Sequence, residues 1–292
     1  MVSIPNALER LVVSLEQAAG LDRLGEAARP LTDAVGPGKA KDLLSGTAVG
    51  HPAHPLLVTV PIGAFASALA LDLSEIDPKA SRRLIGLGLL ASVPTIATGL
   101  SDWGDTEGAE RRVGIAHALS NSAAIGLLGA SWLARRAGGS GRALAWAGFA
   151  VLGVGGWLGG HLAYALGVGV DTTAFTGPPQ EWTDACAESD LSAEKPVAVN
   201  VADMSVLLVR QQAGVSALAD RCTHRGGPLH EGTVVDGCIQ CPWHASRFDL
   251  RDGSVTRGPA TRPQPVLQAR VIDGRVQVRR QETHALRNNP VP

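Results

Sequence analysis

Residues 222–250 read CTHRGGPLHEGTVVDGCIQCPWHASRFDL and contain two short pairs of metal-binding residue types. Cys222 and His224 form a C-x-H pair, and Cys241 and His244 form a C-x-x-H pair. Two loops that each carry one thiolate and one imidazole can close around a two-iron cluster, with both cysteines on one iron and both histidines on the other. The alternative is a single zinc ion on the same side chains, although zinc sites favour C-x-x-C and H-x₃₋₅-H spacing.

The sequence on either side of this stretch is typical of a small all-β domain. The runs VAVNVADMSVLLVR (197–210) and PVLQARVIDGRVQVRR (265–280) are rich in β-branched residues. Turn signals such as Asp252-Gly253 and Asp273-Gly274 separate the expected strands. The two ligand pairs therefore lie on loops of a β-rich domain.

With these motifs, residues 182–280 resemble a Rieske iron–sulfur domain over its whole length. The C-x-H and C-P-x-H loops, Gly226-Gly227 after the first loop and FDLRDG (248–253) after the second carry the resemblance. It implies a [2Fe–2S] cluster and one-electron transfer. Rieske oxygenases also need a mononuclear iron held by a large downstream domain, and only 48 residues follow His244. A complete oxygenase is therefore not expected.

The resemblance also indicates a subtype. Rieske domains that oxidise quinol carry two further cysteines joined as a disulfide, at positions that correspond here to Gly227 and Trp243. Their tyrosine is replaced by Phe248, while Ser246 remains as a donor to a bridging sulfide. Fewer hydrogen bonds to sulfur stabilise the reduced cluster less, so we expect the lower part of the roughly −150 to +300 mV Rieske range. The domain resembles the ferredoxin type.

Four cysteines and eight histidines occur in the chain, and several fall outside the ligand set. Cys238 and Cys186 are expected to be buried small apolar residues. His230 and His284 are expected on the surface.

Upstream of the β-rich region, four stretches carry no Asp, Glu, Lys or Arg. A bilayer core about 30 Å thick is spanned by about 20 apolar residues. A buried helical core of a soluble protein is the alternative, but it leaves no amphipathic outer faces to meet water. We therefore expect four transmembrane helices, at about residues 55–73, 84–102, 113–134 and 143–170.

The sequence HPAHP at His51–Pro55, followed by Pro61-Ile62-Gly63, resembles a bacterial family of four-helix membrane domains of unestablished function. The resemblance covers residues 43–170 and implies an architecture but no activity.

The histidines of the membrane region are candidates for a second site, because ionisable residues are rare inside a bilayer and are functional candidates by default. His117 and His161 each lie 22 residues from residue 139, the centre of the loop between the third and fourth spans. An antiparallel hairpin would place them level, where they could bind haem b, a metal ion or a quinone. His51 and His54 lie on the same side of the membrane. The alternative is two unlinked polar residues bonded to neighbouring backbone or to Asn121.

The expected fold class is a four-helix transmembrane bundle followed by a small all-β Rieske domain. The expected domains are an amphipathic helical lead-in (1–50), a four-span membrane domain (51–170), a linker (171–181), the Rieske domain (182–282) and a tail (283–292). The segments that flank the expected spans hold six Lys and Arg on one side of the membrane and four on the other. This difference does not assign the side of the membrane on which the Rieske domain lies.

These observations lead to one main hypothesis and two alternatives. The main hypothesis is a multi-pass membrane protein that exchanges single electrons with a redox partner protein at the membrane surface, through haem or quinone in the lipid-embedded domain. The alternatives are a redox sensor or scaffold that the helices only anchor, and the electron-transfer subunit of a separate oxygenase. A net charge of −1 with 18% charged residues excludes a basic nucleic-acid-binding protein.

Overall fold

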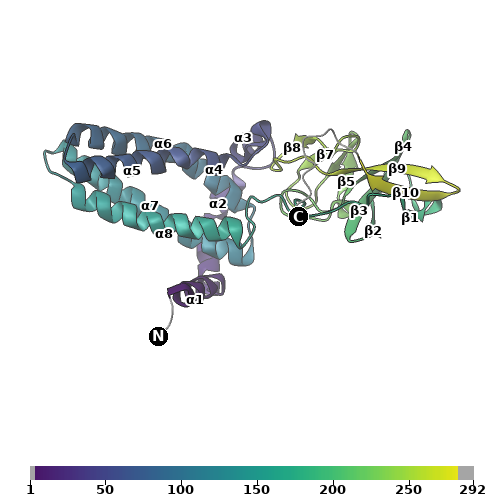
Figure 1. Cartoon of the computed structure of the whole chain (residues 1–292), viewed down its shortest axis with the longest axis horizontal. Coiled ribbons are helices and arrows are strands. Elements are labelled where there is room, and N and C mark those ends of the chain that lie inside the picture. The colour runs from purple at the N-terminus through teal and green to yellow at the C-terminus, as the bar shows by residue number, and fades with distance from the viewer. Residues whose placement is uncertain (1–3, 282–292) are drawn as a thin grey trace. The chain divides into compact units, whose positions relative to one another are not determined.

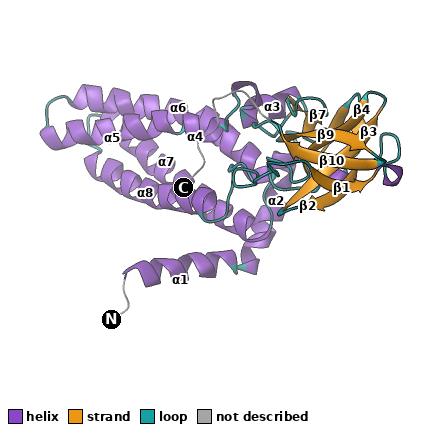
Figure 2. Cartoon of the chain, turned by 45° about the vertical axis from the view of Figure 1, so that its right-hand side comes forward, coloured by secondary structure: helices purple, strands orange, loops and turns teal. Residues whose placement is uncertain are grey.

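The computed structural model describes residues 4–281 and shows two compact units. The helical unit contains the residues up to Gly46 together with Pro52–Val170. The β unit contains Thr47–His51 together with the residues from Asp171 onward. Figure 2 distinguishes the helices of the first unit from the strands of the second. The predicted fold class, a four-helix bundle followed by a small all-β domain, is confirmed.

Among residues 4–281, four helical segments are long and apolar enough to cross a membrane, judged by length and composition. They lie side by side in Figure 1. The shortest has 22 residues, which at 1.5 Å per residue spans about 33 Å and matches a bilayer core. The segments are Ala53–Ser74 (α4, Ala53–Leu57, and α5, Thr59–Ser74), Pro78–Gly104 (α6), Gly108–Arg136 (α7) and Arg142–Tyr164 (α8).

Helices α5 and α6 form one antiparallel hairpin, and α7 and α8 form another. Asp77 caps α6, because its carboxylate accepts the N–H groups of Lys79 and Ala80 over 2.9 and 3.0 Å. In the second hairpin, a Cβ added to Gly141 would lie 2.6 Å from the Ser131 carbonyl oxygen. Only glycine allows α8 to begin beside the last turns of α7, and this close approach sets the register of the hairpin.

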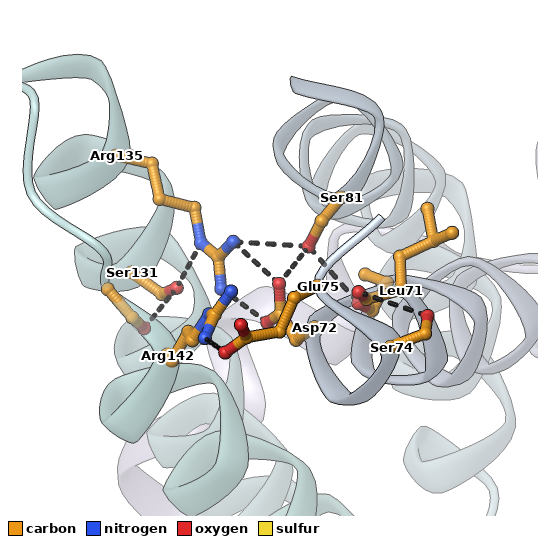
Figure 3. A network of polar contacts seen from close by, with 10 residues as sticks. Leu71, Asp72, Ser74, Glu75, Ser81, Ser131, Arg135 and Arg142 are labelled. Carbon is orange, nitrogen blue, oxygen red and sulfur yellow. Dashed lines mark hydrogen bonds and ion pairs between the residues drawn. The ribbon is translucent and has the colours of Figure 1, made fainter. Parts of the chain in front are cut away.

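A buried ion pair joins the two hairpins (Figure 3). The guanidinium of Arg135 in α7 donates to both carboxylate oxygens of Asp72 in α5, over 2.9 and 2.5 Å. Ser81 in α6 donates to the same carboxylate over 2.7 Å, and Ser131 accepts from Arg135. Both charged groups of the pair are thus hydrogen-bonded, as burial of an ion pair requires.

The apolar core of the bundle lies on the side of the two hairpin loops. Its buried members are Phe65, Ala68, Ile85, Leu128 and Ala145. They come from the middle of α5, the first half of α6, the second half of α7 and the start of α8.

The lead-in contains α1 (Ile4–Glu16), α2 (Asp22–Asp33) and α3 (Lys39–Ser45), and it packs on the helical unit. The guanidinium of Arg112 donates to both carboxylate oxygens of Asp22, over 2.7 and 2.8 Å. Buried Lys41 contacts Asp105 over 2.8 Å. These contacts tie α2 and α3 to α7 and the end of α6.

The fourth span ends earlier than predicted, at Tyr164 rather than at residue 170. Gly167 and Gly169 have φ angles of 72° and 79°. A right-handed helix cannot continue through residues with positive φ. The Leu166 N–H closes the helix by donating to the His161 carbonyl over 3.1 Å.

The β unit contains two antiparallel sheets. The strands of the first, in spatial order, are β1 (Thr183–Ala187), β10 (Arg275–Arg280), β9 (Val266–Ile272), β4 (Gly214–Ala219), β3 (Met204–Gln211) and β2 (Val197–Val201). The second is ordered β5 (Thr233–Val235), β6 (Cys238–Gln240), β7 (Arg247–Asp249) and β8 (Val255–Arg257). Asp273 and Gly274, both with positive φ, form the two-residue turn between β9 and β10.

Two apolar clusters support the β unit. One covers a face of the six-stranded sheet and includes Val206, Leu208 and Val278. The other contains Leu207 and Leu218 of the large sheet, Ile239 and Phe248 of the small sheet, and the predicted ligands Cys222 and Cys241. The packing of this second cluster therefore positions the predicted metal site.

Candidate metal centre

The first predicted ligand loop follows β4 and is closed by a pair of backbone hydrogen bonds. Cys222 N–H donates to the Gly227 carbonyl over 2.9 Å, and Gly226 N–H donates back to the Cys222 carbonyl over 2.8 Å. Gly226 has a φ of 75°, which allows this tight turn. His224 lies between the two hydrogen-bonded positions, at the turn of the loop.

The second predicted ligand loop joins β6 to β7 and repeats the same hydrogen bonds. Cys241 N–H donates to the Ser246 carbonyl over 2.8 Å, and Ala245 N–H donates back to the Cys241 carbonyl over 3.1 Å. Ala245 has a φ of 61° at the position equivalent to Gly226. The two loops are therefore two copies of one backbone shape, each opening on a cysteine.

The two cysteine sulfurs contact each other. The Cys222 thiol donates to the Cys241 sulfur, which raises the pKa of Cys222 and lowers the pKa of Cys241 to about 7. Each sulfur also accepts backbone N–H groups of its own loop. The donors are His224 and Arg225 to Cys222, and Trp243 and His244 to Cys241. Such donors stabilise negative charge on sulfur, so both loops are shaped to hold thiolates.

The two imidazoles form a second pair. The ring centroids of His224 and His244 lie 5.0 Å apart with an interplanar angle of 88°. Two imidazoles on one tetrahedral metal ion have centroids about 5 Å apart, given metal–nitrogen bonds of about 2.0 Å. The Nδ1 atom of His224 is buried. The arrangement thus sorts the four side chains into a sulfur pair and an imidazole pair.

This sorting fits a [2Fe–2S] cluster with two thiolates on one iron and two imidazoles on the other. A mononuclear zinc site instead needs all four side chains around one point. Within residues 4–281, no group of three or more His, Cys, Asp or Glu side chains is arranged to hold a single metal ion.

Glycine is required where the two loops meet. A Cβ added to Gly227 would lie 2.9 Å from the Cys241 sulfur and 3.0 Å from the Trp243 ring. Gly227 and Trp243 are the positions at which the resemblance places the disulfide of quinol-oxidising domains. The structure brings these positions together and fills the space with the indole. The cysteines of the described chain are free thiols.

Two residues outside the predicted ligand set support the loops. Gln264, which is 2% exposed, donates to the Ala219 and Arg221 carbonyls over 2.7 Å and accepts the Thr223 N–H over 3.2 Å, so it fixes the first loop. Arg257 donates to the Ala245 carbonyl over 2.9 and 2.7 Å and so fixes the second loop. The only available signal for Gln264 was its place as an amide between two prolines.

His230, which was expected on the surface, is half-buried and contacts Asp220. Its Nδ1 lies 2.8 Å from the Asp220 carboxylate, and its backbone N–H donates to the same carboxylate over 2.9 Å. The Ser205 hydroxyl also donates to the Asp220 carboxylate, over 3.0 Å. Asp220 comes two residues before Cys222, so this contact supports the first loop. His284 lies outside the described residues.

The remaining cysteines are buried, as predicted. Cys186 in β1 lies in the apolar cluster of the large sheet, and burial raises the pKa of its thiol. Cys238 in β6 is 8% exposed, and Thr256 donates to its sulfur over 3.5 Å.

The helical unit brings together a different pair of histidines from the pair expected. The rings of His54 and His117 have centroids 6.5 Å apart. The His161 Nε2 lies 2.9 Å from the Glu16 carboxylate in α1. His51 is exposed and belongs to the segment of chain assigned to the β unit. The four histidines therefore do not form one site.

The register of α7 and α8 explains this correction. His117 contacts α8 at Gly155, whose carbonyl oxygen accepts from its Nδ1 over 2.8 Å, and a Cβ added to Gly159 would lie 3.0 Å from its ring. His117 is therefore level with the span between these glycines, and His161 lies about one turn further along. The prediction that His117 and His161 are level requires a loop that is symmetric about residue 139. The close approach at Gly141 instead shifts α8 relative to α7.

Two protein-family models match the chain. The model of the Rieske [2Fe–2S] domain matches residues 181–276, and the model of a predicted membrane protein domain, DUF2231, matches residues 50–172. The first match lies within the β unit and includes both ligand loops. The second covers the four long apolar helices.

Individual proteins resemble the β unit. The chain is 33% identical to the ferredoxin subunit of anthranilate 1,2-dioxygenase from Burkholderia cepacia, over 34% of this chain and 91% of that protein. It is also 33% identical to ferredoxin CarAc from Metapseudomonas resinovorans, over 34% of this chain and 94% of that protein. Among solved structures, the ferredoxin of carbazole 1,9a-dioxygenase from Nocardioides aromaticivorans IC177 is 26% identical over 35% of this chain and all of that one, with a TM-score of 0.34.

Proposed function

We propose that this chain, which belongs to the Rieske [2Fe–2S] family, is a membrane-anchored ferredoxin. It transfers single electrons at the membrane surface. Cys222 and Cys241 hold one iron of the cluster, and His224 and His244 hold the other. The observation that carries this proposal is the sorting of the four side chains into a sulfur pair and an imidazole pair.

The cluster supplies a one-electron couple when bound. The residues around it determine how easily that electron is accepted. Two thiolates in place of four make the site less negative, which raises the potential relative to a site with four cysteines. Backbone N–H groups on both sulfurs act in the same direction. Phe248 is buried and has no hydroxyl to donate, so we expect a potential in the lower part of the Rieske range.

A second candidate function concerns the acceptor. Both ferredoxins described above align with this chain over more than nine-tenths of their length, and one is named as a subunit of a dioxygenase. This likeness favours a role as the electron-transfer subunit of a separate oxygenase. The reduced full chain in detergent should then support turnover of a purified oxygenase component that depends on a Rieske ferredoxin. Turnover no faster than without the chain would exclude this candidate for that oxygenase.

For the membrane domain, we propose that the helical unit holds a second one-electron group, haem or quinone, at its intramembrane histidines. The support is the presence of paired imidazoles between helices that match a membrane-protein family.

The experiment that tests the cluster is chemical analysis of the full chain purified in detergent. We expect about two irons and two acid-labile sulfides per chain. Cys241→Ser should abolish the cluster, because it removes one of the two thiolates on the all-sulfur iron. Cys238→Ser is the matched control, three residues away in β6 and outside the ligand pairs, and should keep the full iron and sulfide content.

A colourless protein with one zinc ion per chain would overturn the cluster assignment. So would a Cys238→Ser variant that loses iron to the same extent as Cys241→Ser.

A further inference from the structure

His54 and His117 form a pair of imidazoles inside the helical unit. His54 lies in α4, at the start of the first apolar segment, and His117 lies in α7. Their ring centroids are 6.5 Å apart and the ring planes are inclined at 75°. Two histidines from different helices thus converge in a part of the chain that matches a predicted membrane protein domain.

Backbone carbonyls fix the tautomer of both rings. The Nδ1 of His54 donates to the Thr95 carbonyl in α6 over 3.0 Å, and the Nδ1 of His117 donates to the Gly155 carbonyl in α8 over 2.8 Å. A carbonyl oxygen only accepts, so in the neutral rings the proton lies on Nδ1 and the lone pair on Nε2. Histidines that bind metals are held in this way, by a hydrogen bond from the other ring nitrogen to a carbonyl.

Glycines make room for both rings. A Cβ added to Gly99 in α6 would lie 2.8 Å from the Cε1 of His54. A Cβ added to Gly159 in α8 would lie 3.0 Å from the Cε1 of His117. Each ring therefore occupies a position that a neighbouring helix leaves open by the absence of a side chain.

The half of the bundle that holds the pair differs from the half that holds the apolar cluster. Around the imidazoles lie the buried hydroxyls of Thr95 and Thr98 and the amide of Asn121. The Asn121 amide donates to the His117 carbonyl over 2.9 Å and lies 3.2 Å from the His117 Nε2. Large apolar side chains such as Phe65 and Leu128 pack at the other end. Polar groups are costly inside a bilayer, so their concentration here points to a ligand.

The ring separation indicates how a shared metal would be held. Two imidazoles on opposite sides of one metal ion have centroids about 6 Å apart, given metal–nitrogen bonds of about 2.0 Å. The 6.5 Å of His54 and His117 is close to this arrangement. The 5.0 Å of His224 and His244 is close to that of two ligands on one tetrahedral ion. An ion with two opposed imidazoles keeps its equatorial positions for other donors, and a porphyrin supplies four nitrogens in that plane.

We infer that His54 and His117 are the opposed axial ligands of one haem iron within the four-helix unit. This inference deepens the membrane-domain part of the proposed function by naming the ligand class and the residues. Binding requires the Asn121 amide to give up its contact with the His117 Nε2, and that amide keeps its second acceptor, the His117 carbonyl. His161 and His51 take no part.

The experiment is a titration of iron protoporphyrin IX into the full chain in detergent, followed by optical and EPR spectroscopy. We expect saturation at one haem per chain and the low-spin spectrum of an iron with two imidazole ligands. His54→Ala and His117→Ala should each remove the low-spin spectrum and weaken binding at least about tenfold, because each deletes one axial ligand. His161→Ala is the matched control, an intramembrane histidine bonded to Glu16, and should bind haem as the unaltered chain does.

A further variant guards against misfolding of the histidine variants. Asn121→Ala removes the side chain that competes for the His117 Nε2 and should bind haem at least as tightly as the unaltered chain. The Rieske EPR signal, recorded on the same samples, reports the proposed cluster separately from the haem site. Binding that never saturates, a low-spin spectrum that survives both His54→Ala and His117→Ala, or a spectrum lost only in His161→Ala would each overturn the inference without affecting the cluster assignment.

Discussion

The described part of the chain holds two imidazole pairs, one in each unit, and the two are built by different means. His224 and His244 lie on loops whose shape is fixed by backbone hydrogen bonds within a few residues of each ligand. His54 and His117 lie on helices, where their separation depends on how α4, α6, α7 and α8 pack over their whole length. The first pair is therefore a local property of the sequence, and the second is a property of helix register.

This difference predicts that damage to helix packing affects only the pair in the helical unit. The largest expected effect is at the buried ion pair of Asp72 and Arg135, which joins the two hairpins. Asp72→Asn leaves the Arg135 charge without its partner and should lower the unfolding free energy of the helical unit by about 3–5 kcal/mol. The measurement is unfolding in mixed SDS–detergent micelles, with the Rieske EPR signal recorded in parallel.

Glu75→Gln is the matched control, because the Glu75–Arg142 pair lies nearby and the Glu75 side chain is 71% exposed. Loss of the Glu75–Arg142 ion pair should change the unfolding free energy by less than about 1 kcal/mol. Equal effects of the two substitutions would show that the buried pair does not join the hairpins.

The converse prediction concerns the β unit. Gly227→Ala places a methyl group 2.9 Å from the Cys241 sulfur and 3.0 Å from the Trp243 ring, so the loops must separate. We expect a loss of stability of about 1–3 kcal/mol and a lower iron content, measured by denaturant unfolding and metal analysis. Gly177→Ala, where nothing lies within 4 Å, should change neither. An unchanged iron content in Gly227→Ala would contradict the close contact of the loops.

A smaller effect should distinguish two adjacent glycines in α8. Gly160→Ala meets nothing within 4 Å and should stabilise the helix by up to about 1 kcal/mol through helix propensity alone. Gly159→Ala gains the same propensity, but its methyl group lies 3.0 Å from the His117 ring. The unfolding free energy of Gly159→Ala should therefore fall below that of Gly160→Ala. Equal values would mean that His117 does not rest on Gly159.

Much of this architecture is readable from the sequence, and the parts that are not share a cause. The four charge-free stretches and the spaced cysteines and histidines at 222–244 are local patterns. The separation of His161 from His117 is not, because it depends on the close approach of Gly141 in α8 to Ser131 in α7. The pairing of His54 with His117 depends on the packing of α4 and α7, which lie far apart in the sequence. The contact of His230 with Asp220 also depends on tertiary structure, since a short 3-10 helix at Leu229–Glu231 turns His230 back toward the first loop.

The smallest predicted effect is on pH dependence, and it belongs to the β unit. Hydrogen bonds from Arg251 hold the pKa of Asp249 below its ordinary value, and Asp249 ends β7, the strand that follows the second loop. A carboxylate whose pKa is lower in the folded state stabilises the fold above the unfolded pKa. That contribution disappears as the pH falls through the folded pKa, below about pH 4. Asp249→Asn should flatten this part of the stability curve, and an unchanged curve would exclude the contact as its source.

In the proposed function, two imidazoles and two thiolates hold one cluster in the β unit. The most direct test is electron–nuclear double resonance on the dithionite-reduced full chain labelled with ¹⁵N-histidine. This ligand set predicts a low average g value and couplings to two histidine nitrogens, both lost together in His224→Ala or His244→Ala. A reduced iron–sulfur signal without any histidine nitrogen coupling would contradict it.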